Sequence, residues 1–180
     1  MRKGRYLVKI VSPVLGLICL LVALGFAGQA ARMALAGPGD VTARASVTNA
    51  QSSNISLTIA SSSFTVAGPV NTAQTLTEAV KTTVITSNKT GYTLTIRGSG
   101  DFKGSLTNNT DAIPLANLSV APKGGTTFTP LSLLDQVIIK TTKPTTPAGD
   151  AMSWDVKLNI PFVQEDTYST TLTYTATNNP

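Results

Sequence analysis

Few side chains in this sequence could perform catalytic chemistry. The chain has no histidine, and its one cysteine, Cys19, lies within an apolar run near the N-terminus. Residues 37–180 therefore lack the bases and nucleophiles of the usual catalytic triads and the ligands of most transition-metal sites. No Ser-x-x-Lys motif occurs either. We predict a protein that is not an enzyme and that has no catalytic residue, no cofactor and no metal site.

The carboxylates do not change this prediction. The chain's nine acidic residues are spread over predicted turns and strand edges. Asp155 is expected on the solvated face of a strand, where pairing with Lys157 explains it better than general-base catalysis. The oxygen-bearing side chains between residues 101 and 111 do not have the spacing of a calcium-binding loop. Their ordinary role in turns accounts for them.

The first 36 residues have the order of a secretory signal peptide. Basic residues precede an apolar run over residues 10–26, and Ala34-Leu35-Ala36 then offers a small-residue cleavage site. We predict a signal peptide over residues 1–36, cleaved after Ala36, with Ala30 as the second choice. An uncleaved membrane anchor is the alternative, because the apolar run is at the lower limit for crossing a bilayer.

The basic character of the chain belongs to this leader. Five of the 14 Lys and Arg residues lie in residues 1–36, which leaves nine basic and nine acidic residues in residues 37–180. A neutral domain has neither the charge expected of a nucleic-acid partner nor a basic run for a membrane surface. It also lacks cysteine, which fits export without oxidative folding. We predict a secreted, extracellular protein on the surface of a Gram-positive-type bacterium, with no membrane contact after leader cleavage.

Residues 37–180 have the length of one domain and show the period-two alternation of β-strands without any helical period. The clearest strands are residues 152–160 and 168–177, and the second is long enough to be a central strand. Further strands are predicted over residues 41–48, 55–59, 64–66, 75–87, 92–96 and 136–141, and loops with one or two short strands over residues 98–130. This pattern predicts an all-β, antiparallel β-sandwich of about seven to nine strands with Greek-key or jelly-roll wiring, preceded by the signal peptide helix.

Two connections are predicted to be hairpins. Asn88-Lys89-Thr90-Gly91 is short and ends in a glycine that can take the left-handed conformation, so residues 75–87 and 92–96 are expected to pair. The loop over residues 162–167 is expected to pair the last two long strands in the same way. The run Val137-Ile138-Ile139 predicts a buried strand, and residues 76–80 are expected to be locally irregular.

Threonines in Thr-x-Thr rows, such as Thr171, Thr173, Thr175 and Thr177, could form a flat ladder that binds water or polymers. Threonine also suits the exposed face of any strand. Because no internal repeat stacks these rows, the sequence favours the second interpretation.

Two segments resemble the WxL family of bacterial surface domains. TSNKTGYTLTI (residues 86–96) is similar to the stretch around that family's first Trp-x-Leu motif, and DTYSTTLTYTATNNP (residues 166–180) is similar to its C-terminal ending. Tyrosine stands here at both tryptophan positions, and alanine at the second leucine. The resemblance implies an exported β-sandwich that attaches noncovalently to the cell wall. Its motif residues correspond to Tyr92 with Leu94, and to Tyr174 with Ala176.

We therefore expect an exported, non-catalytic cell-surface protein, noncovalently associated with the cell wall as a binding or structural domain. Its expected partners are a cell-wall polymer or other surface proteins. The candidate binding residues are Tyr92, Leu94 and Tyr174, although their inward alternation also makes the tyrosines core anchors. The alternative is a self-assembling surface fibre or matrix subunit. In that homo-oligomer, residues 41–48 would be exchanged between neighbouring copies.

Overall fold

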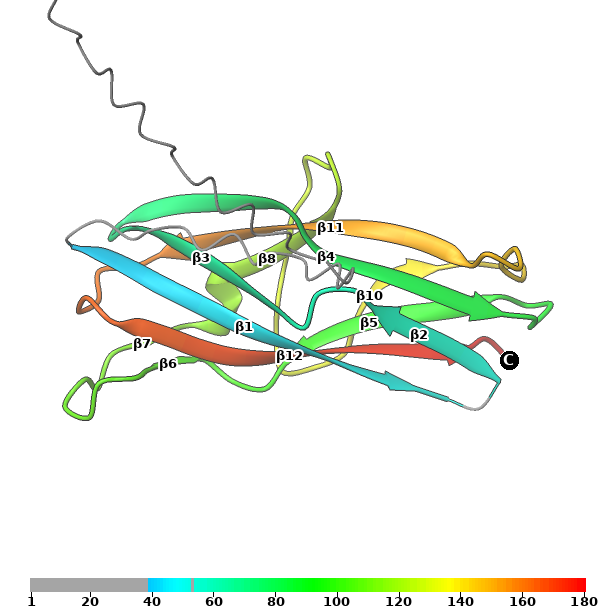
Figure 1. Ribbon diagram of the computed structural model, residues 1–180, viewed down its shortest axis with the longest axis horizontal. Helices are drawn as coiled ribbons and strands as arrows, with labels where there is room; N and C mark the ends of the chain where they lie inside the picture. The colour runs from blue at the N-terminus through cyan, green and yellow to red at the C-terminus, as the bar shows by residue number, and fades with distance from the viewer. Residues whose placement is uncertain (1–38, 53) are drawn as a thin grey trace, which may run out of the picture.

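The computed structural model of the protein describes residues 39–52 and 54–180 (Figure 1). The predicted signal peptide and its cleavage sites lie outside these residues. Within the described part of the chain, no helical segment is both long enough and apolar enough to span a membrane.

The described residues form an all-β sandwich of two sheets, as predicted. In the described part of the chain, nine strands have five residues or more and three have only two or three. The predicted number of seven to nine matches the longer strands, because two- and three-residue strands leave no alternation to detect. The strands are β1 Asp40–Gln51, β2 Ile55–Ile59, β3 Ser63–Pro69, β4 Thr72–Thr86, β5 Tyr92–Gly98, β6 Phe102–Gly104, β7 Ala112–Ile113, β8 Leu118–Pro122, β9 Thr129–Pro130, β10 Gln136–Lys140, β11 Asp150–Ile160 and β12 Thr167–Asn178.

The large sheet has seven strands in the order β10-β5-β12-β1-β3, with β6 paired to β12 and β7 paired to β6. The small sheet has five strands in the order β2-β4-β11-β8-β9, and a 3-10 helix, Leu115–Asn117, precedes β8. β12 is central, as its length predicts, and runs beside β1 along the long axis of the molecule (Figure 1). These two strands are parallel, whereas the other strand pairs are antiparallel.

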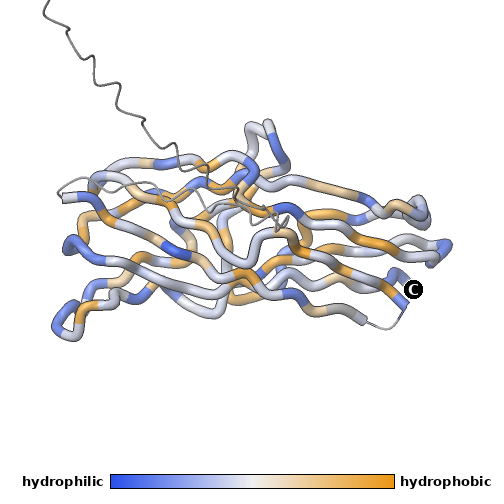
Figure 2. The backbone as a smooth tube through the Cα atoms, in the orientation of Figure 1, coloured by the Kyte–Doolittle hydropathy of each residue, from blue (hydrophilic) through white to orange (hydrophobic). Residues whose placement is uncertain are grey.

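The core lies between the sheets and consists of the inward-facing residues of both. On β12, Tyr168, Leu172, Tyr174 and Ala176 are buried, and on β11 the buried residues include Trp154, Val156, Leu158 and Ile160. The turns at the two ends of the molecule are mostly hydrophilic (Figure 2). Each large buried side chain contributes about 1.5 to 3 kcal/mol to the stability of the fold. The inward residues of the period-two pattern therefore hold the two sheets together.

The predicted pairing of residues 75–87 with residues 92–96 is wrong. β4 pairs with β2 and β11 in the small sheet, whereas β5 pairs with β10 and β12 in the large sheet. The loop crosses from one sheet to the other. Gly91 does take the left-handed conformation, with φ at 80°, and a Cβ there would lie 2.6 Å from the carbonyl oxygen of Thr141. The glycine therefore serves a crossing loop instead of a hairpin.

The predicted hairpin between the last two long strands is also wrong, since β11 belongs to the small sheet and β12 to the large one. In both cases the apolar faces of the two strands point into the gap between the sheets. A loop that crosses between the sheets leaves these apolar faces as well buried as a hairpin would. The alternation of apolar and polar residues therefore cannot distinguish a crossing loop from a hairpin.

The strand over residues 136–141 is present as β10, but it is not buried. Among the described residues, β10 is an edge strand that pairs with β5 alone, and Val137 is 59% exposed. A β-bulge between Val137 and Ile139 interrupts its register with β5. Apolar composition alone therefore gave a wrong prediction of burial here.

Residues 76–80 are irregular, as predicted, and this irregularity explains why the expectation for Asp155 is wrong. The β4–β11 register shifts beside Asp155, and Glu78 adopts a φ of 51° there. Asp155 is only 4% exposed, and its carboxylate accepts hydrogen bonds from the backbone N–H groups of Glu78 (2.7 Å) and Gly124 (2.8 Å). Asp155 thus holds the bulge instead of pairing with Lys157 in solvent.

A second carboxylate, Asp166, joins the loop before β12 to the loop after β6. It accepts hydrogen bonds from the Ser105 hydroxyl (2.6 Å), the Leu106 N–H (3.0 Å) and the Asn109 amide (2.7 Å). Desolvation opposes ionisation, but these bonds and one from the Thr167 N–H outweigh it and hold the pKa of Asp166 well below its usual range. This contact fixes the point where the central strand begins.

Candidate binding face

The structure brings the two family-like motifs together, on the inner face of the large sheet. β5 and β12 are neighbours, with Leu94 opposite Ala176 and Tyr92 opposite Asn178. Tyr92, Leu94, Tyr174 and Ala176 are all fully buried. The three candidate binding residues from the sequence are therefore core residues, and a polymer on the surface of the described chain cannot reach them.

The two motif tyrosines have different surroundings. The Tyr92 hydroxyl donates a hydrogen bond to the Asp150 carboxylate at 3.2 Å, and burial, together with the charge of Asp150, raises the pKa of Tyr92. The Tyr174 hydroxyl is buried without a hydrogen-bond partner among the described residues, and burial raises its pKa. A buried hydroxyl without a partner costs stability, whereas a bonded one does not.

This difference predicts opposite effects of removing the two hydroxyls. Tyr174→Phe is expected to raise the free energy of unfolding by about 1 kcal/mol, because it removes an unsatisfied polar atom. Tyr92→Phe, the matched control, is expected to lower it by about 1 kcal/mol through loss of the bond to Asp150. Thermal unfolding followed by circular dichroism should show shifts of about 2 to 4 °C in opposite directions. A lower melting temperature for Tyr174→Phe would contradict the prediction.

The outward side of the same strands carries a continuous array of hydroxyl groups, which we call the hydroxyl face. It is built from alternate residues of the three central strands of the large sheet. Its members are Arg44, Ser46 and Thr48 on β1, Thr171, Thr173, Thr175 and Thr177 on β12, and Thr93, Thr95 and Arg97 on β5.

Strand register aligns these side chains into rows across the sheet. Thr173 lies opposite Thr48 on one side and Arg97 on the other, and Thr175 lies opposite Thr95. Neighbouring strands are about 4.8 Å apart, and alternate residues of one strand are about 6.8 Å apart. The hydroxyl oxygens of Thr48 and Thr173 are within 3.3 Å of each other. The face therefore presents a regular grid of hydrogen-bonding groups on a rigid sheet.

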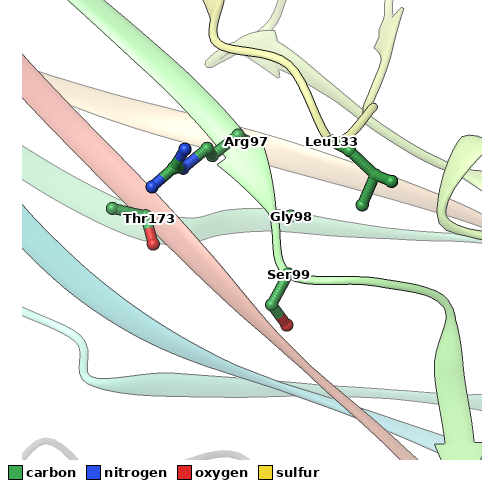
Figure 3. A pocket seen from close by; sticks show the side chains of 5 residues that line it. All are labelled: Arg97, Gly98, Ser99, Leu133 and Thr173. Carbon is green, nitrogen blue, oxygen red and sulfur yellow. The ribbon is translucent and has the colours of Figure 1, made fainter.

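A shallow hollow lies on this face, with a volume of about 350 Å³. Arg97, Gly98, Ser99, Leu133 and Thr173 line it. Arg97 extends from β5 toward Thr173 on β12, while Leu133 comes from a separate loop (Figure 3). The hollow thus combines a guanidinium, two hydroxyls and one apolar side chain. The Arg97 Nε lies 3.8 Å from a carboxylate oxygen of Asp135, and both side chains are about half exposed.

The chemistry available to the hydroxyl face is hydrogen bonding and ion pairing. Arg44 and Arg97 are its charged members, and two carboxylates border the face: Asp40, at the start of β1 on the same side of the sheet, and Asp135, which pairs with Arg97. No group of three or more His, Cys, Asp or Glu side chains in the described part of the chain is placed to hold a metal ion. A neutral or anionic polymer with many hydroxyl and amide groups matches this surface.

Sequence reasoning identified the threonine row of β12 but dismissed it, because the chain has no internal repeat. The array does not come from a repeat. It comes from three strands that are neighbours in the sheet but distant in the chain: β1 and β5 lie on either side of β12, and Thr48 and Thr173 are 125 residues apart in sequence. The signal in the sequence was Thr and Ser at alternate positions of each of these strands.

The comparisons with known proteins add no relative. No protein-family model matches the chain, and none of the curated proteins matches it either. The resemblance to the WxL family therefore remains a prediction from the two quoted segments.

Proposed function

We propose that this protein is an exported, non-catalytic cell-surface protein that binds a cell-wall polymer noncovalently through the hydroxyl face. The observation that carries the proposal is the alignment of Thr48, Thr173 and Arg97 in one row across three adjacent strands. The signal-peptide pattern of residues 1–36, the lack of catalytic groups in the sequence and the resemblance to the WxL family also support it.

The physical basis is the fit between a flat grid and an extended polymer. Threonine has a short, β-branched side chain with restricted χ1, so ordering it on binding costs little entropy. Arg97 adds a bidentate donor for a carboxylate or phosphate group of the polymer. In this proposal, Tyr92, Leu94 and Tyr174 act from the core: they hold β5 and β12 in register but do not touch the ligand.

Retention of the purified protein on insoluble peptidoglycan tests the proposal. At moderate salt, we expect retention clearly above that of an albumin control. Replacing Thr95 and Thr173 with valine and Arg97 with glutamine should weaken binding on the order of tenfold, because two hydroxyls and a charge are lost while valine keeps the shape of threonine.

The matched control also replaces two threonines with valine and one basic residue with glutamine, on the outward side of the small sheet. Thr58→Val, Thr75→Val and Lys157→Gln should leave retention unchanged, since these side chains lie on the opposite face of the sandwich. Equal loss in both triple variants, or no retention of the unaltered protein, would remove the wall-binding proposal.

A further inference from the structure

Three of the six exposed large hydrophobic residues of the described chain lie at the β10 edge of the large sheet. Leu133, Leu134 and Val137 are 61%, 77% and 59% exposed, and they occupy the end of the β9–β10 loop and β10 itself. Among the described residues, β10, β3, β7, β2 and β9 are the edge strands of the two sheets. Of these five, β10 alone carries an exposed large hydrophobic residue. Apolar side chains beside unpaired backbone groups form a surface suited to another strand.

The register of β10 with β5 places Asp135 and Lys140 at equal distances on either side of Val137. Gln136 and Val137 pair with consecutive residues of β5, and so do Ile139 and Lys140, which leaves Ile138 as the extra residue of the bulge. On β5, Arg97 beside Asp135 and Thr93 beside Lys140 each lie two positions from Thr95, the partner of Val137. Asp135 and Lys140 are therefore equally distant from Val137 along the edge. Their neighbours on β5, Arg97 and Thr93, both belong to the hydroxyl face, so Asp135, Val137 and Lys140 share the outward side of the sheet.

Charge complementarity identifies the partner. If a second β10 runs antiparallel to the first with the two Val137 residues opposite each other, Asp135 of each copy faces Lys140 of the other. A lone lysine on a sheet edge discourages pairing, but here each lysine has an acidic partner. Lys140 makes no ion pair with any described residue of its own chain. Such a two-fold contact uses the same patch on both copies, as closed dimers do.

We propose that two copies of this protein associate through β10, joining their large sheets into one continuous sheet with a two-fold axis at Val137. The two Val137 side chains then cover each other at the axis, while Leu133 and Leu134 of each copy lie beyond the Asp135–Lys140 contacts, at the two ends of the joined edge. The two hydroxyl faces lie side by side on the same side of the joined sheet. This association is independent of the wall-binding proposal.

This mode of assembly differs from the exchange of the first strand. β1 is paired on both sides within its own chain, with β12 and with β3. Its exchange would break both ladders before new ones form. Pairing through β10 breaks no strand pair, because the outer side of β10 has no strand partner in the described chain.

Sedimentation velocity over a wide range of protein concentrations tests the proposal. The unaltered protein is expected to form a dimer as its concentration rises. Asp135→Lys places lysine opposite Lys140, and Lys140→Asp places aspartate opposite Asp135, so each variant should dimerise on the order of tenfold more weakly. An equimolar mixture of the two variants should recover the dimer, because both contacts in the mixed pair then join opposite charges.

The control variants, Lys157→Asp and Glu165→Lys, reverse single charges away from the edge and should dimerise like the unaltered protein. Val137→Thr, a mild change at the axis, should weaken the dimer without loss of the strand signal in circular dichroism. A monomer at every concentration would overturn the proposal. It would equally be overturned by a dimer that resists both charge reversals, or by a mixture that does not recover.

Discussion

Replacing Trp154 with alanine is expected to lower the free energy of unfolding by about 3 to 5 kcal/mol. Trp154 is the largest fully buried side chain of the described residues, at the centre of β11, between β4 and β8. Its indole N–H donates a hydrogen bond to the Thr82 hydroxyl at 3.0 Å, within the core. The substitution therefore leaves a cavity and also removes the donor that satisfies Thr82. Urea denaturation followed by circular dichroism measures the loss.

Thr82→Val separates the two contributions. Valine keeps the shape of threonine but leaves the indole N–H without its acceptor, which should cost about 1 to 3 kcal/mol. Trp154 is the only tryptophan of the chain, so its fluorescence reports on its surroundings in this variant. A loss below 1 kcal/mol for Trp154→Ala would show that Trp154 does not hold the two sheets together.

Replacing Asp155 with alanine should cost about 3 kcal/mol, the second-largest effect that we predict. The substitution leaves the backbone N–H groups of Glu78 and Gly124 without their acceptor. It also removes the contact that holds Glu78 at its positive φ of 51°, where a non-glycine residue is strained. Asp155→Asn should cost about half as much, since one amide oxygen can accept only part of what two carboxylate oxygens accept.

Asp135→Ala is the matched control for this prediction. It removes the same chemical group from a half-exposed position, where the ion pair with Arg97 is solvated and contributes about 0 to 1 kcal/mol. Both variants can be compared by urea denaturation at a protein concentration low enough to keep the chain monomeric. Equal stability losses at the two positions would show that burial and the two N–H bonds do not distinguish Asp155.

The inward residues of the long strands could be predicted from the sequence. Tyr92 and Tyr174 were assigned to the core because they alternate with polar residues, and the side-chain period of a strand is two. The same rule failed for Asp155, which alternation placed in solvent. The bulge in β4 brings the Glu78 N–H to that position, and the turn after β8 brings the Gly124 N–H. No local pattern at Asp155 indicates a bulge or a turn elsewhere in the chain.

The neighbours of each strand could not be predicted in the same way. The loop ending at Gly91 has the length and the glycine of a hairpin, yet it joins strands of different sheets. Val137 lies in an apolar run typical of a buried strand, yet it occupies an exposed edge. Both errors concern which strand lies beside which.

The sequence by itself determined that this protein is a β-sandwich and which side of each long strand faces its core, because burial of apolar side chains leaves a period of two in the chain. Only the tertiary structure decided that the outward threonines of β1, β12 and β5 form one face and that β10 is left with an open edge. The bonds that pair strands join backbone groups that are nearly the same in every residue, so they carry little sequence signal. The order of the strands depends on how the apolar faces of all strands are covered together, and no single segment of the sequence contains that information.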